Sequence, residues 1–128
     1  METLEPQHKL LVIKTQPHIL KGRKTLYHSV RWAWRINADR ASKADFVLGC
    51  VNDICEGMFV ADKWMHAAPR NFPHFSDPDN RPDFPHHRPD RFGFDGHEAD
   101  YDIQQLYVGK LLPDSQRGGQ TRIRYINC

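Results

Sequence analysis

The chain has 128 residues, of which 39% are hydrophobic and 27% charged, with a formal net charge of +2 and a mean hydropathy of −0.71. This length suits one domain with one buried core, and seven Phe, four Tyr and three Trp argue against wholesale disorder. No stretch approaches the roughly 20 apolar residues of a membrane helix, and residues 1–6 lack the layout of a signal peptide. We therefore expect a cytoplasmic protein that does not bind membranes.

The first third of the chain predicts one strand and two short helices. Residues 8–14 form an apolar run with β-branched members and polar flanks, as in a central strand. Thr25 is a suitable N-cap for a helix over residues 26–31, and Asn37 is one for a helix over residues 38–43.

The clearest pattern in the chain predicts a β-hairpin. Two apolar runs, residues 45–51 and 54–60, flank the dipeptide Asn52-Asp53, which is typical of a two-residue turn. Cys50 and Cys55 lie inside these runs, where a thiol is more often an inert buried side chain than a nucleophile. The three cysteines show no CxxC spacing, so neither a disulfide framework nor a zinc ribbon is indicated.

Residues 69–91 hold six of the nine prolines, which predicts an irregular surface loop. We expect this loop to lie outside the sheet and to pack through Phe72, Phe75 and Phe84. Its histidines and aspartates are potential metal ligands, but their spacing matches no known metal motif, so we expect neither a metal nor a cofactor. Those side chains, with His97 beyond the loop, are His74, Asp77, Asp79, Asp83, His86, His87 and Asp90.

The last part of the chain predicts a strand at residues 91–94, a helix over residues 97–107 and a half-buried strand at residues 121–126. The resulting order, β-α-α-β-β-loop-β-α-β, indicates one α+β domain over residues 1–128. Its sheet is expected to be small and mixed or barrel-like.

Several phrases of the sequence resemble a small bacterial domain of poorly defined function, which occurs alone or beside nuclease domains of the GIY-YIG type. The phrases span most of the chain outside residues 69–90, but the GIY-YIG signature itself is absent, so no nuclease activity is implied. They lie at residues 26–31, 34–36, 40–48, 92–96, 107–110 with Pro113, and 117–125.

Residues 19–25 (ILKGRKT) are similar to the opening phrase of the ASCH branch of the PUA-like superfamily. The resemblance implies a PUA-like barrel and recognition of nucleic acid or a nucleotide. Tyr27 and Ser29 stand where that branch has an acid and an arginine, so no catalytic ASCH activity is implied.

Charge is segregated along the chain. Residues 1–43 hold nine Lys and Arg against three acids, residues 44–109 hold five against twelve, and residues 110–128 hold four against one. If the first and last strands pair in one sheet, their basic residues form one face that suits a polyanion. The alternative is that these cations are scattered over solvated surfaces.

Two groups of residues are candidates for that contact. Arginines and tryptophans alternate in residues 31–35, and aromatic planes beside guanidinium groups suit stacked bases and phosphates. Around the Gly118-Gly119 turn, further cations accompany a backbone that forms either an anion-binding nest or a plain hairpin turn. The candidate binding residues are Arg31, Trp32, Trp34, Arg35, Trp64, Lys110, Arg117, Arg122 and Arg124. For each of the two tryptophans in residues 31–35, the alternative to stacking on a base is burial in the core.

The sequence therefore predicts a non-catalytic module that recognises nucleic acid or a nucleotide. The first alternative is an enzyme on the same substrates, in which an acid (Asp45, Asp53 or Asp95) and a histidine (His28 or His97) carry protons. The second alternative is a protein-interaction or inhibitor module that uses the acidic middle segment as its binding surface.

Overall fold

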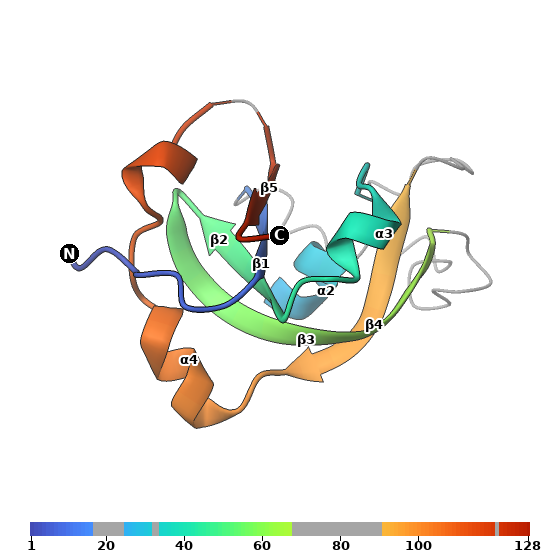
Figure 1. Cartoon of the computed structure of the whole chain (residues 1–128), viewed down its shortest axis with the longest axis horizontal. Helices are drawn as coiled ribbons and strands as arrows, with labels where there is room; N and C mark the ends of the chain where they lie inside the picture. The colour runs from blue at the N-terminus through green and yellow to red at the C-terminus, as the bar shows by residue number, and fades with distance from the viewer. Residues whose placement is uncertain (17–24, 32–33, 68–90, 120) are drawn as a thin grey trace.

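The computed structural model describes residues 1–16, 25–31, 34–67, 91–119 and 121–128, and within them lies a five-stranded mixed sheet with three short α-helices (Figure 1). The strand order is β4-β3-β2-β1-β5; β1 and β2 are parallel, and the other neighbours are antiparallel. This is the α+β class that the sequence predicts. The elements are β1 (Leu10–Thr15), α2 (Leu26–Arg31), α3 (Ala38–Ala41), β2 (Phe46–Val51), β3 (Ile54–His66), β4 (Phe92–Glu98), α4 (Tyr101–Tyr107), the 3-10 helix η2 (Asp114–Gln116) and β5 (Ile123–Ile126).

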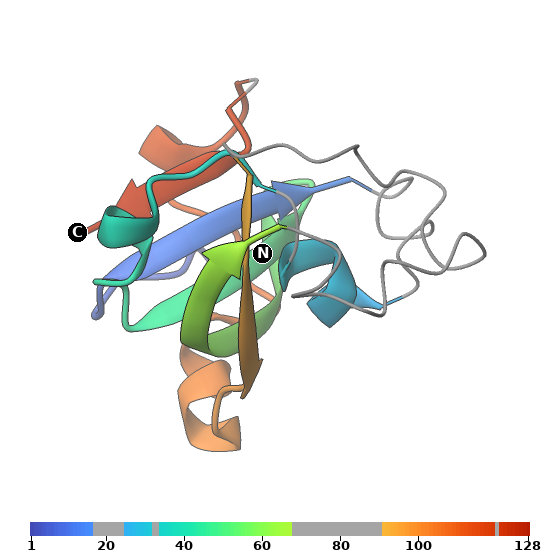
Figure 2. The same ribbon diagram turned by 90° about the vertical axis from the view of Figure 1, so that its right-hand side faces the viewer.

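The central strand β1 buries side chains on both of its faces. Leu10 and Val12 join the hydrophobic cluster that α4 covers, whereas Leu11 and Ile13 join the cluster beneath α2 and α3. Successive side chains of a strand point to opposite faces, so the uninterrupted apolar run at residues 10–13 fits a strand covered on both sides. Figures 1 and 2 show α4 on one side of the sheet and α2 and α3 on the other.

The predicted hairpin is confirmed, and its second strand is longer than predicted. Asn52 and Asp53 both have positive φ angles (53° and 64°), as a two-residue turn between antiparallel strands requires. Beyond Val60, β3 continues to His66 and curves under α2 and α3, and its second half pairs with β4 (Figure 1). The sheet has β4 and β5 as its edges, and no pairing between these two strands closes it into a barrel in the part of the chain that the structure describes.

Both predicted N-caps of the first helices are confirmed. The Thr25 hydroxyl accepts a hydrogen bond from the His28 N–H at 3.1 Å, and the Asn37 side chain accepts one from the Arg40 N–H at 3.1 Å. The second helix, however, ends at Ala41 rather than at residue 43.

The helix predicted over residues 97–107 begins at Tyr101 instead. His97 and Glu98 belong to β4, because they pair with Val60 and Phe59 of β3. Ladder hydrogen bonds with a neighbouring strand here outweigh the helical spacing of the apolar residues, which is a tertiary effect that local sequence does not encode.

Helix α2 lies almost directly on the backbone of the hairpin. A Cβ atom at Gly49 would lie 2.6 Å from the Val30 side chain, and one at Gly57 would lie 2.5 Å from Leu26. A Cβ atom at either position would have to push the Val30 or Leu26 side chain aside, so the facing glycines of β2 and β3 let α2 lie close to the sheet.

The predicted loop at residues 69–91 lies outside the described residues except for Arg91, and so do its expected Phe contacts and its candidate metal ligands. None of the helices that the structure describes is both long and apolar enough to cross a membrane.

Candidate anion-binding site

A polar hollow of about 490 Å³ lies at the carboxyl ends of the parallel strands β1 and β2. Residues that end or follow these two strands meet there, because adjacent parallel strands end at the same edge of the sheet. The segment between η2 and β5 forms the opposite wall. The lining residues are Lys14, Thr15, Gln16, Asn52, Asp53, Gly118, Gly119, Thr121 and Arg122.

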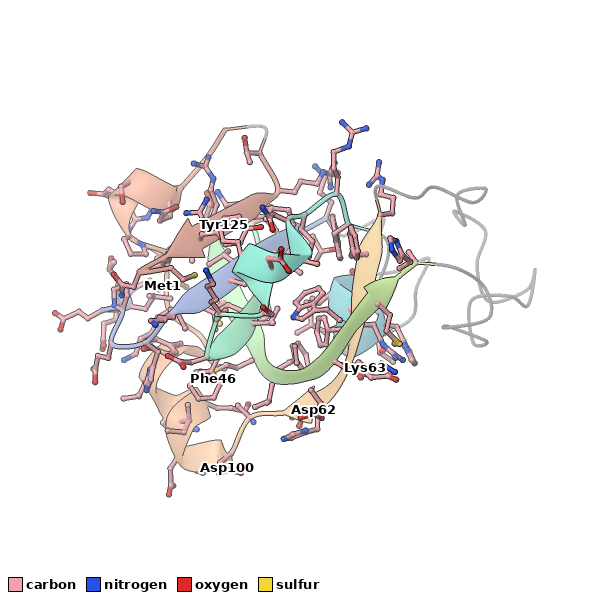
Figure 3. The ribbon with its side chains drawn as sticks, turned by 45° about the vertical axis from the view of Figure 1, so that its right-hand side comes forward. Met1, Phe46, Asp62, Lys63, Asp100 and Tyr125 are labelled. Carbon is pink, nitrogen blue, oxygen red and sulfur yellow. The ribbon has the colours of Figure 1, made fainter. Side chains whose placement is uncertain are left out.

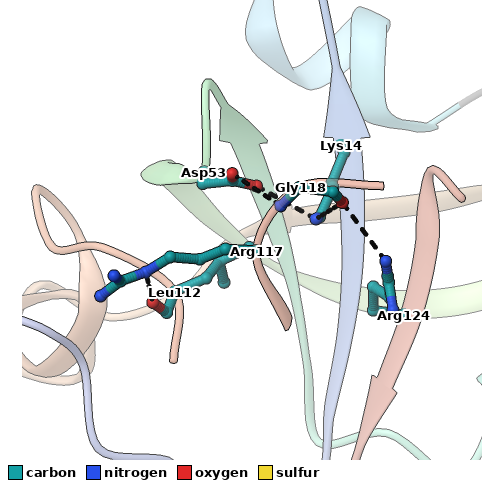
Figure 4. Close-up of polar contacts among 6 residues, drawn as sticks. All are labelled: Lys14, Asp53, Leu112, Arg117, Gly118 and Arg124. Atoms are coloured by element: carbon teal, nitrogen blue, oxygen red, sulfur yellow. Dashed lines mark hydrogen bonds and ion pairs between the residues drawn. The ribbon is translucent and has the colours of Figure 1, made fainter. Parts of the chain in front are cut away.

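Lys14, Asp53 and Gly118 are joined in one network (Figure 4). The Lys14 ammonium lies 3.0 Å from the Asp53 carboxylate and donates to the Gly118 carbonyl at 3.0 Å. The Gly118 N–H donates to the other carboxylate oxygen of Asp53 at 2.9 Å. The turn of the β2–β3 hairpin therefore holds both the lysine and the glycine segment in place.

Arg122 and Arg124 lie on the same face of the sheet as Lys14. Arg124 is opposite Val12 in the antiparallel β1–β5 ladder, and the Lys14 N–H donates to the Arg122 carbonyl at 2.7 Å. Side chains that alternate along paired strands share a face, so the face that is apolar at Leu10 and Val12 becomes cationic at its end. We call Lys14, Arg122 and Arg124 the basic edge. The first and last strands thus bring their cations together, as the sequence predicts for paired terminal strands.

The two arginines of the basic edge are not satisfied by the protein. Among the described residues, Arg122 Nη1 and Arg124 Nε are buried nitrogens without a hydrogen-bond partner. Arg124 does donate from Nη2 to the Gly118 carbonyl at 3.3 Å (Figure 4). An unpaired buried donor costs roughly 1–3 kcal/mol, more when it is charged, so these two nitrogens carry a cost that the described residues do not offset.

Asp53 is ionised in this network. Burial raises the pKa of its carboxyl, but the Gly118 N–H and the Lys14 ammonium outweigh burial, and the pKa lies below its usual value. Asp53 therefore balances one of the three charges of the basic edge, and two positive charges remain beside the hollow.

Gly118 and Gly119 form neither of the two predicted structures. Both have positive φ angles (66° and 74°), but they connect η2 to β5, which pairs with β1 and not with η2, so they are not a hairpin turn. The Gly118 N–H already binds the Asp53 carboxylate, so it is not available to an external anion as in a nest. Instead, the Gly118 carbonyl accepts hydrogen bonds from Lys14 and Arg124.

The predicted group at residues 31–35 begins at the last residue of α2, and its described members Arg31 and Trp34 make contacts inside the fold. Arg31 donates from Nε to the Phe94 carbonyl at 3.0 Å, pairs with Asp95, and lies over the Tyr27 ring at 4.8 Å. Its side chain is 12% exposed. Arg31 is therefore a link between α2 and β4 rather than a surface contact.

The tryptophans of this group are packed to different extents. Trp34 is 5% exposed, and its indole N–H donates to the Val30 carbonyl at 2.7 Å, so the prediction that it stacks on a base is wrong and core burial is right. Trp64 is half-buried with its ring 5.0 Å from Phe94. We call Arg31, Trp34 and Trp64 the aromatic cluster. Arg35 is exposed, and Trp32 lies outside the described residues.

Lys110 and Arg117 are engaged near the hollow but not in it. Lys110 lies 2.8 Å from Glu2, and this contact lowers the pKa of Glu2. Arg117 donates to the Leu112 carbonyl at 2.6 Å (Figure 4) and to the Thr3 hydroxyl at 2.8 Å. Both cations attach the segment around Leu111 to the N-terminal residues, so they stabilise one side of the site.

Of the residues named for an enzyme, only Asp53 is among the described residues that line the hollow. Asp53 lines the hollow, but no histidine is among the nine residues that do. Asp45 accepts from the Lys9 N–H at 2.9 Å, and His97 pairs with Asp62 on the exposed surface of β3 and β4. Among the described residues that line the hollow, no histidine accompanies the acid.

The neighbouring thiols of Cys50 and Cys55 are not suited to act as nucleophiles. Cys50 and Cys55 face each other across β2 and β3 and are fully buried free thiols. The hydrogen bond to Cys55 and burial raise the pKa of Cys50, so the reactive thiolate is disfavoured. In the described ranges no group of three or more His, Cys, Asp or Glu residues is placed to hold a metal ion.

Comparison of this chain with protein-family models, curated proteins and solved structures finds no match.

Sequence reasoning missed the polar residues that complete the hollow, namely Thr15, Gln16, Asn52 and Thr121, and it did not single out Lys14 at the end of β1. One signal was present. A lysine in register with buried Leu10 and Val12 interrupts an otherwise apolar face, which marks the place where that face meets solvent.

Proposed function

We propose that this chain recognises nucleic acid or a nucleotide, and that it holds phosphate groups at the basic edge. The observation that carries the proposal is the pair of arginines Arg122 and Arg124. Arg122 lines the open hollow, Arg124 donates to Gly118 in its wall, and each keeps one buried nitrogen without an acceptor in the described structure. Arginine binds phosphate through charge-assisted and often bidentate hydrogen bonds.

Two further parts of the proposal come from the sequence. The resemblance of residues 19–25 to the PUA-like superfamily suits such a ligand, although nearly all of these residues lie outside the described ones. The free thiols of Cys50, Cys55 and Cys128 suit a reducing compartment, and we include a cytoplasmic location in the proposal.

The test is binding of fluorescein-labelled single-stranded DNA and RNA 12-mers, followed by fluorescence anisotropy from 25 to 200 mM salt. We expect binding that weakens with salt, because each neutralised phosphate releases counterions. The double variant Arg122→Ala/Arg124→Ala should lose about tenfold or more in affinity and reduce the salt slope by about one to two.

The matched control is the double variant Lys9→Ala/Lys63→Ala, which removes the same charge from two exposed positions. Lys9 precedes β1 at the end opposite Lys14, and Figure 3 shows Lys63 on β3 well separated from Tyr125 of β5. The control should bind nearly as the parent chain does. An equal loss in both variants, or no binding by the parent at 25 mM salt, would contradict the proposal.

A further inference from the structure

The hollow at the ends of β1 and β2 also limits which phosphate it can hold. We propose that its ligand is a terminal phosphate monoester, carried by a free nucleotide or by the end of a strand, rather than an internal phosphodiester. This inference rests on the proposed function and specifies the chemical group that the same site binds.

The volume of the hollow is the first argument. About 490 Å³ falls within the range of small-molecule sites, roughly 300–1,000 Å³, and is enough for a phosphate with part of the attached sugar. Proteins that bind internal phosphates instead follow the backbone with a groove that spans several nucleotides. A single hollow between two strand ends and the Gly118 segment fits an end better than a continuous strand.

Charge is the second argument. With Asp53 opposed to Lys14 at 3.0 Å, the charges of Arg122 and Arg124 remain unbalanced, and neither arginine makes an ion pair with a described residue. A phosphate monoester carries about −1.5 to −2 charges at pH 7, whereas each phosphodiester carries one. Arg122, which lines the hollow, and Arg124, which contacts Gly118 in its wall, together supply two uncompensated charges, and these match the monoester.

Two members of the basic edge, Lys14 and Arg124, are also held in position before any ligand arrives. The Gly118 carbonyl accepts from both Lys14 and Arg124, so these cations are directed toward the same side (Figure 4). A Cβ atom at Gly119 would lie 2.8 Å from Arg124 Nη2, so a glycine at this position leaves room for the guanidinium group. Pre-positioned charges bind without the entropy cost of ordering long side chains.

The residues that line the hollow indicate that the site does not recognise the base of its ligand. None of its nine residues is Phe, Tyr or Trp, and beside the charged groups it offers the hydroxyls of Thr15 and Thr121 and the amides of Gln16 and Asn52. Without an aromatic plane, the hollow as the structure describes it has no surface on which to stack a base. We therefore expect the phosphate to determine affinity and the identity of the base to matter little.

The experiment compares ligands that differ only in their ends. One 12-mer sequence is prepared as RNA and as DNA with a 5′-phosphate, with a 3′-phosphate or with hydroxyls at both ends, and each competes against a labelled 5′-phosphorylated 12-mer. Adenosine 5′-monophosphate, guanosine 5′-monophosphate, cyclic adenosine monophosphate and adenosine form the second set. The arms distinguish a 5′ end, a 3′ end and a free nucleotide as the source of the monoester.

We expect at least one monoester arm to bind about tenfold or more tightly than its hydroxyl or cyclic counterpart, with the two mononucleotides within about threefold of each other. Arg122→Ala should abolish this preference, and Arg122→Lys, which keeps the charge but loses the planar fork, should restore part of it. Circular dichroism of both variants establishes that they are folded.

Equal affinity of phosphorylated and unphosphorylated 12-mers, lost together in Arg122→Ala/Arg124→Ala, would overturn this inference and leave the proposed function standing. Absence of binding by every ligand would overturn both. A strong preference for one mononucleotide would overturn the statement that the base is not read.

Discussion

The aromatic cluster and the basic edge are built from similar residues, yet the fold uses them differently. In the aromatic cluster, the Arg31 guanidinium pairs with Asp95 and the Phe94 carbonyl, and Trp34 is buried. In the basic edge, Arg122 and Arg124 keep buried nitrogens without a partner in the described structure. The comparison shows that arginines of one chain differ in how fully their donors find acceptors inside the fold, which composition alone does not reveal.

Among the substitutions considered, we expect the largest loss of stability from one in the aromatic cluster. Trp34→Ala removes an indole that is 5% exposed and leaves a cavity, so the free energy of unfolding should fall by about 3–5 kcal/mol. Urea denaturation followed by circular dichroism measures the change, with Trp34→Phe as a milder control. A loss below about 1 kcal/mol would mean that Trp34 is not part of the core.

Arg31→Ala should destabilise the protein less, by about 1–3 kcal/mol, because it removes charge-assisted bonds to β4 and leaves the Phe94 carbonyl without this donor. Asp95→Ala is the matched variant and should cost under about 1 kcal/mol, since Asp95 is 56% exposed. Neither substitution should alter oligonucleotide affinity. If Arg31→Ala is folded but binds oligonucleotides more weakly, Arg31 is part of the binding surface and this prediction is wrong.

The network around Asp53 predicts a smaller effect that depends on pH. The pKa of Asp53 in the folded chain lies below its unfolded value of about 3.9, so its contribution to stability is complete above that value. The contribution is lost as the pH falls through the folded pKa, when Asp53 becomes protonated and releases Lys14. Between pH 5 and pH 2 the parent chain should therefore lose more stability than Asp53→Asn, as measured by urea midpoints. Parallel curves for the two proteins would contradict this role.

The smallest effect on stability is expected at the basic edge. Arg122→Ala removes a side chain with an unsatisfied buried nitrogen and no ion pair in the described structure, so the free energy of unfolding should change by less than about 0.5 kcal/mol. The measurement is the same urea titration. A loss above about 1 kcal/mol would show that Arg122 is structural, and the contrast between the two regions would disappear.

Much of the fold was predictable because its signals are local. The two N-caps and the hairpin turn at Asn52-Asp53 are read from a few adjacent residues, and the structure confirms each of them. The extension of β3 to His66 and the start of α4 at Tyr101 depend on pairing with β4. That pairing joins segments on either side of residues 69–91, and no local pattern specifies it.

The site was predicted only in part, for a similar reason. Arg122 and Arg124 are two residues apart in the strand predicted over residues 121–126, and this spacing alone predicts that both side chains lie on one face. Their meeting with Lys14 depends on the β1–β5 ladder, and their separation from Arg31 depends on which arginine finds an acceptor within the fold. Whether an arginine keeps a free donor is a property of the assembled molecule.

The pairing of Leu10 with Ile126 has a consequence for how the proposed phosphate site forms. Contacts between segments so distant in sequence close a large loop at a cost in chain entropy, so we expect this pairing to form late in folding. Lys14 cannot meet Arg122 until β5 has docked, so a ribosome-bound chain that lacks β5 should not bind phosphate even if its hairpin has formed. During refolding, ligand binding should therefore recover only when β5 has paired with β1, so binding can be used to detect the completed sheet.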